Sequence, residues 1–130
     1  MKKLLIACLI LVFGTVSAYA GDPPKFFQDT YPDYALKSAL EARGILEGSE
    51  AQLDAKTRQL IALGVAAQVP CAYCVYAHTK QARAAGATEG EIREAVATAA
   101  TVRQWSTVLN GMAYDLEAFK EEVDKMQPSN

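Results

Sequence analysis

Two cysteines and the only histidine of the chain lie within eight residues of one another, in the segment 71–78, which reads CAYCVYAH. On an α-helix, which turns by about 100° per residue, Cys71, Cys74 and His78 fall on one face. The first turn of a helix exposes unpaired backbone N–H groups, whose partial positive charge stabilises a thiolate. Cysteines in such positions titrate at about 3.5–7.5 instead of about 8.5. The spacing therefore predicts a redox-active pair of thiols with an imidazole beside it.

His78 follows Cys74 by one helical turn and is expected to accept or relay the proton of that thiol, since the unperturbed pKa of an imidazole is about 6.5. Three other interpretations remain open. The cysteines can form a purely structural disulfide, although closing a four-residue loop contributes only about 2 kcal/mol, against roughly 3 for a fifteen-residue loop. They can bind zinc with His78, but residues 21–130 hold no fourth Cys or His, so no metal site is predicted. His78 can also be an ordinary core or surface histidine.

The first twenty residues are expected to form a secretory signal peptide. Two lysines precede an uncharged apolar run over residues 4–16, and small residues at positions 18 and 20 suit cleavage before Gly21. Lipidation at Cys8 and an uncleaved membrane anchor are the alternatives. Export points to the periplasm, where oxidising conditions would allow Cys71 and Cys74 to form a disulfide with each other.

The composition is that of an ordinary globular domain and excludes a disordered chain, because 51% of the 130 residues are hydrophobic and 22% are charged. The net charge of −2 becomes −4 when the two leader lysines are removed. A chain with this charge offers no surface for a polyanion, so nucleic acid is not expected as a partner.

Apolar spacing predicts an all-α fold, a compact array of about five to six helices, because no run alternates with a period of two. The helix that follows Asp54 is apolar on almost every face over residues 60–67 and is expected to be buried on several sides.

An extended lead-in is expected at 22–24, and a polar linker at 44–53. We expect a leader at 1–20, an extension with the first helix at 21–53 and one helical domain at 54–130. The expected helices and their end signals are a helix from Asp33 to Gly44, one from the cap Asp54 to Pro70, one from Cys71 to Ala85 with Gly86 as terminator, one from the capping box Thr88–Glu91 to Gly111, and one over 112–126.

Several motifs in residues 54–111 together resemble the carboxymuconolactone decarboxylase superfamily, and within it the alkylhydroperoxidase D-like branch. They are the segment KTRQLIAL at 56–63, the pattern Cys71-x-x-Cys74-x-x-x-His78, Gly86 and the segment EIREA at 91–95. Decarboxylases of the superfamily generally lack the cysteine pair. Its presence therefore favours the peroxidase-type branch.

The resemblance implies an all-helical, alkylhydroperoxidase D-like fold that is usually a homo-oligomer. No cofactor is predicted. It also implies a role for each site residue. Cys74 would attack a hydroperoxide, Cys71 would resolve the sulfenic acid as an intramolecular disulfide, and His78 would assist proton movement. An external dithiol or a thioredoxin-like reductant would then restore both thiols.

The chain departs from the family pattern at two positions. Gln59 replaces a family glutamate, and a primary amide cannot take up a proton at physiological pH, although it can orient His78 by hydrogen bonding. Tyr73 stands where the family can have a histidine. Tyr73 and Tyr76 are expected either to line a peroxide entrance or to pack in the core, and Trp105 is expected in the core.

The preferred hypothesis is a peroxiredoxin-type antioxidant enzyme that reduces hydroperoxides with Cys71, Cys74 and His78. One alternative is a non-catalytic helical binding or oligomeric module with an inert disulfide. The other is a decarboxylase-like enzyme that abstracts a proton beside a carboxylate without redox chemistry.

Overall fold

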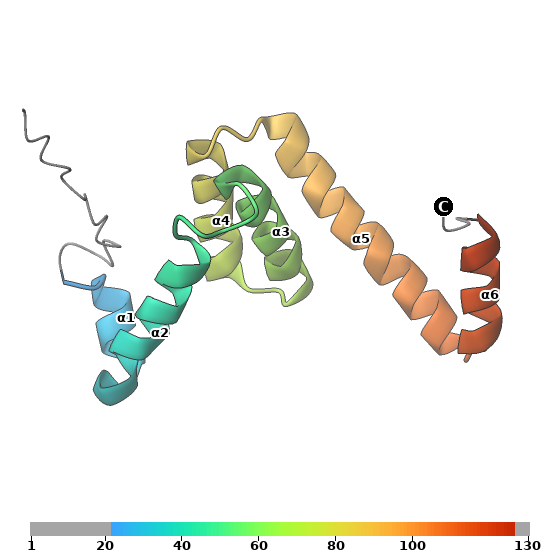
Figure 1. Ribbon diagram of the computed structural model, residues 1–130, viewed down its shortest axis with the longest axis horizontal. Helices are drawn as coiled ribbons and strands as arrows, with labels where there is room; N and C mark the ends of the chain where they lie inside the picture. Colours follow the sequence, from blue (N-terminus) through green and yellow to red (C-terminus); the bar gives the residue numbers. More distant parts are fainter. Residues whose placement is uncertain (1–21, 127–130) are drawn as a thin grey trace, which may run out of the picture. The chain divides into compact units, whose positions relative to one another are not determined.

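The computed structural model describes residues 22–126, and within this range it contains six helices and no strand (Figure 1). The predicted all-α class is confirmed. The expected leader, residues 1–20, lies outside the described residues. Between residues 22 and 126 no helix is long and apolar enough to cross a membrane. The helices are α1 (Lys25–Thr30), α2 (Asp33–Leu46), α3 (Ala55–Gln68), α4 (Ala72–Ala84), α5 (Glu89–Gly111) and α6 (Leu116–Met126).

The chain divides into two compact units, one ending at Gln52 and the other beginning at Leu53. In the first unit the lead-in at 22–24 is non-helical as predicted, but helix α1, which begins directly after Pro24, was not predicted. Proline is favoured at the start of a helix, since the first N–H groups of a helix have no intrahelical partner and proline has no N–H. Helix α2 runs past Gly44 to Leu46, so this glycine does not end the helix as expected. An interior glycine weakens a helix by only about 0.5–1 kcal/mol and does not necessarily break it.

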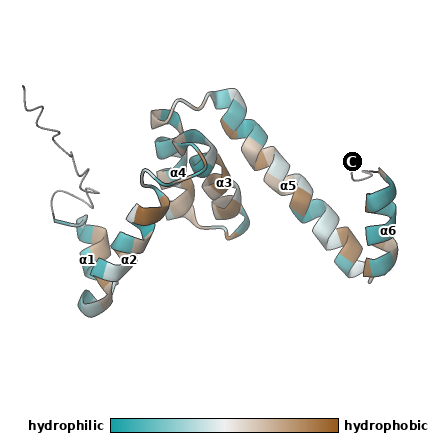
Figure 2. Ribbon diagram, in the orientation of Figure 1, coloured by the Kyte–Doolittle hydropathy of each residue, from teal (hydrophilic) through white to brown (hydrophobic). Residues whose placement is uncertain are grey.

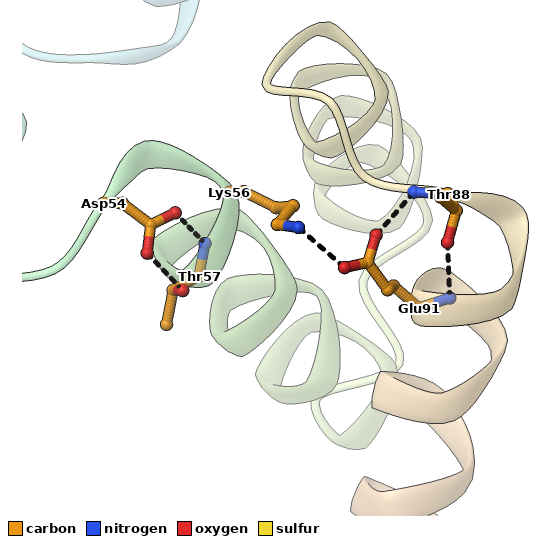
Figure 3. Close-up of polar contacts among 5 residues, drawn as sticks. All are labelled: Asp54, Lys56, Thr57, Thr88 and Glu91. Atoms are coloured by element: carbon orange, nitrogen blue, oxygen red, sulfur yellow. Dashed lines mark hydrogen bonds and ion pairs between the residues drawn. The ribbon is translucent and has the colours of Figure 1, made fainter.

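In the second unit the local end signals act as the sequence predicts. The Asp54 carboxylate accepts the Thr57 backbone N–H at 3.0 Å and caps α3. The Thr88 hydroxyl accepts the Glu91 N–H while the Glu91 carboxylate accepts the Thr88 N–H, which completes the capping box of α5 (Figure 3). Gly86 ends α4 with a φ of +86°, a backbone conformation that an L side chain rarely adopts.

Helix α3 packs against both α4 and α5, and the core of the unit lies along it. Leu63 is 1% exposed and forms a cluster with Ala82 of α4 and Ile92 of α5. Hydrophobic residues recur along α3 and at intervals along α5 (Figure 2). The prediction that α3 is buried on several sides is confirmed in part: α4 and α5 cover two sides of it, whereas Ile61 and Val65 remain more than half exposed. The reason is that α4 and α5 cover only part of the circumference of α3.

The C-terminal part of the unit also differs from the prediction. Trp105 is not in the core but more than half exposed, since it lies on the half of α5 that extends beyond α3. Helix α6 begins at Leu116, four residues later than expected, because Ala113 has a φ of +48° and Asp115 accepts the Ala118 backbone N–H at 2.8 Å. Among the described helices, none packs against α6.

An ion pair joins α3 to the start of α5. The Lys56 Nζ lies 2.6 Å from a carboxylate oxygen of Glu91, and the other carboxylate oxygen accepts the Thr88 N–H (Figure 3). The hydrogen bond from Lys56, followed by those from Thr88, lowers the pKa of Glu91 from 4.5 to about 2. The same contact raises the pKa of Lys56.

Replacing Glu91→Gln should reduce stability at neutral pH and flatten its acid dependence. The folded-state pKa of Glu91 lies below its unfolded value, so the stabilisation is present above about pH 4.5 and is lost as the pH falls through about 2. Urea unfolding at a series of pH values measures this effect. The two proteins should converge in stability near pH 2. The control Glu94→Gln, on the same helix, should retain the acid dependence of the native chain.

Candidate functional site

The two cysteines lie at the start of α4 and are joined by a disulfide, with their Cα atoms 5.2 Å apart. Cys71 is the N-cap of the helix, and its Sγ accepts the backbone N–H of Cys74 at 3.2 Å. The Cys71 N–H donates to the Ala66 carbonyl of α3 at 3.1 Å, so the end of α3 fixes the position of the first cysteine. One sulfur thus occupies the positive end of the helix dipole, where a thiolate is favoured.

His78 is held by α3. Its Nδ1 lies 2.7 Å from Oε1 of Gln59, a residue that is buried at 9% exposure. A carboxamide oxygen only accepts hydrogen bonds, so Nδ1 carries the proton. The neutral imidazole therefore has its unprotonated nitrogen at Nε2, which is the atom that can act as a base. Gln59 thus orients the ring and selects its tautomer.

The helix is continuous from Ala72 to Ala84, so Cys74 and His78 are one turn apart on the same element. Residues four apart on a helix have Cβ atoms about 5–6 Å from one another. Both side chains are half-buried, as is Cys71. Helices α3 and α4 contain no Asp or Glu, so no carboxylate of these helices opposes the formation of a thiolate. The structure thus brings Cys71, Cys74, His78 and Gln59 together at the α3–α4 contact.

Tyr73 and Tyr76 flank the second cysteine on the outer surface of α4. Tyr73 is 89% exposed and Tyr76 is 68% exposed, which contradicts a place in the core for either ring. The ammonium group of Lys80 lies 5.6 Å from the centre of the Tyr76 ring. A role of the two rings at a peroxide entrance stays a prediction.

A groove of about 590 Å³ lies between α3 and α5, away from the residues of the cysteine site. Sequence reasoning did not predict it, although the apolar character of α3 on nearly all sides was a signal for it. None of Gln59, Tyr73, Tyr76, His78 or the cysteines lines it. Its lining residues are mostly apolar: Leu60, Ile61, Gly64, Val65, Gln68, Val69, Glu91, Glu94, Ala95, Thr98, Ala99 and Val102.

The fold and the site define an all-α protein with a Cys-x-x-Cys pair at the start of a helix and a histidine one turn further on. The chain belongs to the carboxymuconolactone decarboxylase family, whose sequence pattern matches residues 34–117. It is also 44% identical over 55 residues to a Paracoccus denitrificans protein named "Uncharacterized protein 4 in cox locus". The matched stretch is 42% of this chain and spans half the length of that curated relative.

The contact between Gln59 and His78 predicts how the titration of the histidine changes when residue 59 carries a charge. In Gln59→Glu a carboxylate replaces the amide that accepts from Nδ1, and an adjacent negative charge favours the imidazolium. The pH midpoint of the imidazole signal should rise by about one pH unit or more relative to the native chain. Because His78 is the only histidine, proton NMR follows it without assignment. Thr107→Glu, which adds the same charge on an exposed part of α5, should leave the midpoint within about 0.2 of a unit.

Proposed function

We propose that this protein is a thiol-dependent hydroperoxide reductase of the alkylhydroperoxidase D-like branch, exported to the periplasm. The observation that carries the proposal is the Cys71–Cys74 disulfide on the first turn of α4, with a hydrogen-bonded histidine one turn further along the same helix. A disulfide that closes so short a loop contributes little stability. A redox role therefore explains the disulfide at the start of α4 better than a purely structural role does.

The reaction starts from the reduced pair. The Cys74 thiolate attacks one peroxide oxygen, an S–O bond forms as the O–O bond breaks, and the leaving alkoxide takes up a proton to become an alcohol. The Cys71 thiol then attacks the Cys74 sulfenic acid and releases water. The product is the Cys71–Cys74 disulfide present in the structure. An external dithiol returns two electrons and two protons to the pair and becomes a disulfide itself.

The two cysteines differ in their surroundings, which supports different roles. Cys71 receives the backbone N–H of Cys74, so negative charge is stabilised on its sulfur. A stabilised thiolate is the better leaving group when a reductant opens the disulfide at Cys74. Cys74 is the cysteine one turn from His78, and the imidazole of His78 would take the thiol proton.

The test of the proposal is the product of a single turnover. The protein is reduced without oxygen and mixed with one equivalent of an alkyl hydroperoxide, and its mass is then measured. The native chain should lose two hydrogens as the disulfide forms, with one equivalent of alcohol released. Cys71→Ser should stop at a sulfenic acid on Cys74, which a nucleophilic dione probe captures. Cys74→Ser should react at least about 100-fold more slowly with the peroxide.

The two serine variants are matched controls for each other, because each retains one thiol of the pair. Sulfenic acid on Cys71 in Cys74→Ser, with none in the reciprocal variant, would reverse the assigned roles. A reduced pair that stays inert to peroxide, and whose thiols alkylate only above about pH 8.5, would favour the inert oligomeric module. Turnover of a carboxylate substrate that survives Cys74→Ser would favour the decarboxylase-like enzyme.

The amide at position 59 is expected to limit the rate. Gln59→Glu provides a group that can exchange protons with His78, so single-turnover peroxide reduction should accelerate by about 10-fold or more. Gln59→Leu removes the acceptor for Nδ1–H and should slow the reaction. Both rates are measured by stopped flow, and circular dichroism verifies equal helix content. Equal rates in the native chain, Gln59→Glu and Gln59→Leu would show that His78 takes no part in peroxide reduction.

A further inference from the structure

Two tyrosine rings protrude into solvent at the end of α4 that carries the disulfide. Tyr73, which lies between the two cysteines in the sequence, is 89% exposed, and Tyr76 is 68% exposed. The two residues are three apart and share one side of the helix. Side chains on a helix lean toward its N-terminus, which is where the disulfide lies. Exposed tyrosines provide large, rigid contact areas for other polypeptides, so these rings form a contact surface beside the redox pair.

The surroundings of the pair stabilise its reduced form. A thiolate on Cys71 would lie at the positive end of the helix dipole and accept the Cys74 backbone N–H. The charged side chains of α3 and α4 are all basic, namely Lys56, Arg58, Lys80 and Arg83. Lys80 takes part in none of the ion pairs found between residues 22 and 126. A disulfide whose reduced form is stabilised in this way is readily passed to other thiols.

We propose that this protein passes its disulfide to exported polypeptides that still carry free thiols, and that Tyr73 and Tyr76 bind the extended chain beside those thiols. The proposal rests on the proposed function for its compartment and for its oxidant, a hydroperoxide. Exported proteins form their disulfides in an oxidising compartment, so their unfolded chains are a source of dithiols there. Two open aromatic rings pack against many kinds of side chain, which suits partners of varied sequence. The unfolded chain is then the external dithiol of the cycle.

The transfer consists of two thiol–disulfide exchanges. A thiolate of the polypeptide attacks the Cys74 Sγ, a bond forms between these two sulfurs, and the Cys71–Cys74 bond breaks with Cys71 as the leaving thiolate. The second thiolate of the polypeptide then attacks the polypeptide sulfur of this mixed disulfide and releases Cys74. The polypeptide loses two electrons and two protons, and both cysteines of the protein become thiols. With reoxidation by peroxide, one hydroperoxide and one dithiol yield one alcohol, one water and one disulfide.

The test begins with the oxidised protein and contains no peroxide, so it is independent of the peroxide reaction. An unstructured peptide with two cysteines and flanking apolar residues is added at equal concentration, and both masses are measured after an acid quench. The peptide should lose two hydrogens and the protein should gain them, with transfer at least about 90% complete. A peptide with one cysteine should form a mixed disulfide at Cys74. A protein that dithiothreitol reduces but the peptide does not would overturn the proposal and leave peroxide reduction to its own test.

Replacing Tyr73→Ser and Tyr76→Ser together removes both rings and retains the disulfide. Transfer to the peptide should slow by at least about 10-fold, because tyrosines at a contact surface carry a large share of the binding energy. Reduction by dithiothreitol is too small a reaction partner to need the rings and should change by less than about threefold. The matched control Tyr34→Ser, which removes a 91% exposed ring from α2, should leave both rates unchanged.

Equal peptide rates in the native chain and the double variant would exclude the tyrosine surface. An equal loss with dithiothreitol and with the peptide would place the effect in the disulfide itself and would also exclude that surface. Both rings are exposed, so the fold should tolerate their removal, which circular dichroism verifies. If the double variant does not fold, the native protein still decides. It should oxidise a peptide with aromatic residues beside its cysteines at least about 10-fold faster than one with serines there.

Discussion

The hydrogen bond between the buried Gln59 amide and the His78 ring is the contact on which the candidate site depends. It links α3 to α4, fixes the rotation of the imidazole and places its proton on Nδ1. The Cys71 N–H bond to Ala66 ties the start of α4 to the end of α3. Between these two contacts, the cysteine pair is held on a helix whose own N-terminus favours a thiolate.

A glutamine at position 59 favours the stability of the fold over proton transfer to His78. Burying a hydrogen-bonded amide costs little free energy on folding, whereas a buried carboxylate must be neutralised or paired. Gln59 therefore stabilises the α3–α4 contact without a buried charge, but it cannot exchange a proton with His78.

The core of the second unit is small, and it consists mainly of Leu63, Ala82 and Ile92 among the described residues. Small helical units have a high ratio of surface to volume and gain stability by covering apolar surface with a further element. The open face of α3 and the extended half of α5 are consistent with such a requirement. Family membership accounts for the helices and for the position of the site, but it does not by itself assign the reaction.

The sequence alone determined the features that act within about four residues. The cap at Asp54, the capping box of Thr88 and Glu91, the left-handed Gly86 and the position of Cys74 and His78 one turn apart on α4 all follow from local hydrogen bonding and helical periodicity. The resemblance to the family suggested that Gln59 orients His78, but the 2.7 Å contact across nineteen residues exists only because α3 and α4 pack together. The exposure of Ile61, Val65 and Trp105 was likewise decided by tertiary structure, since periodicity shows that a helix has an apolar face but not which element covers it.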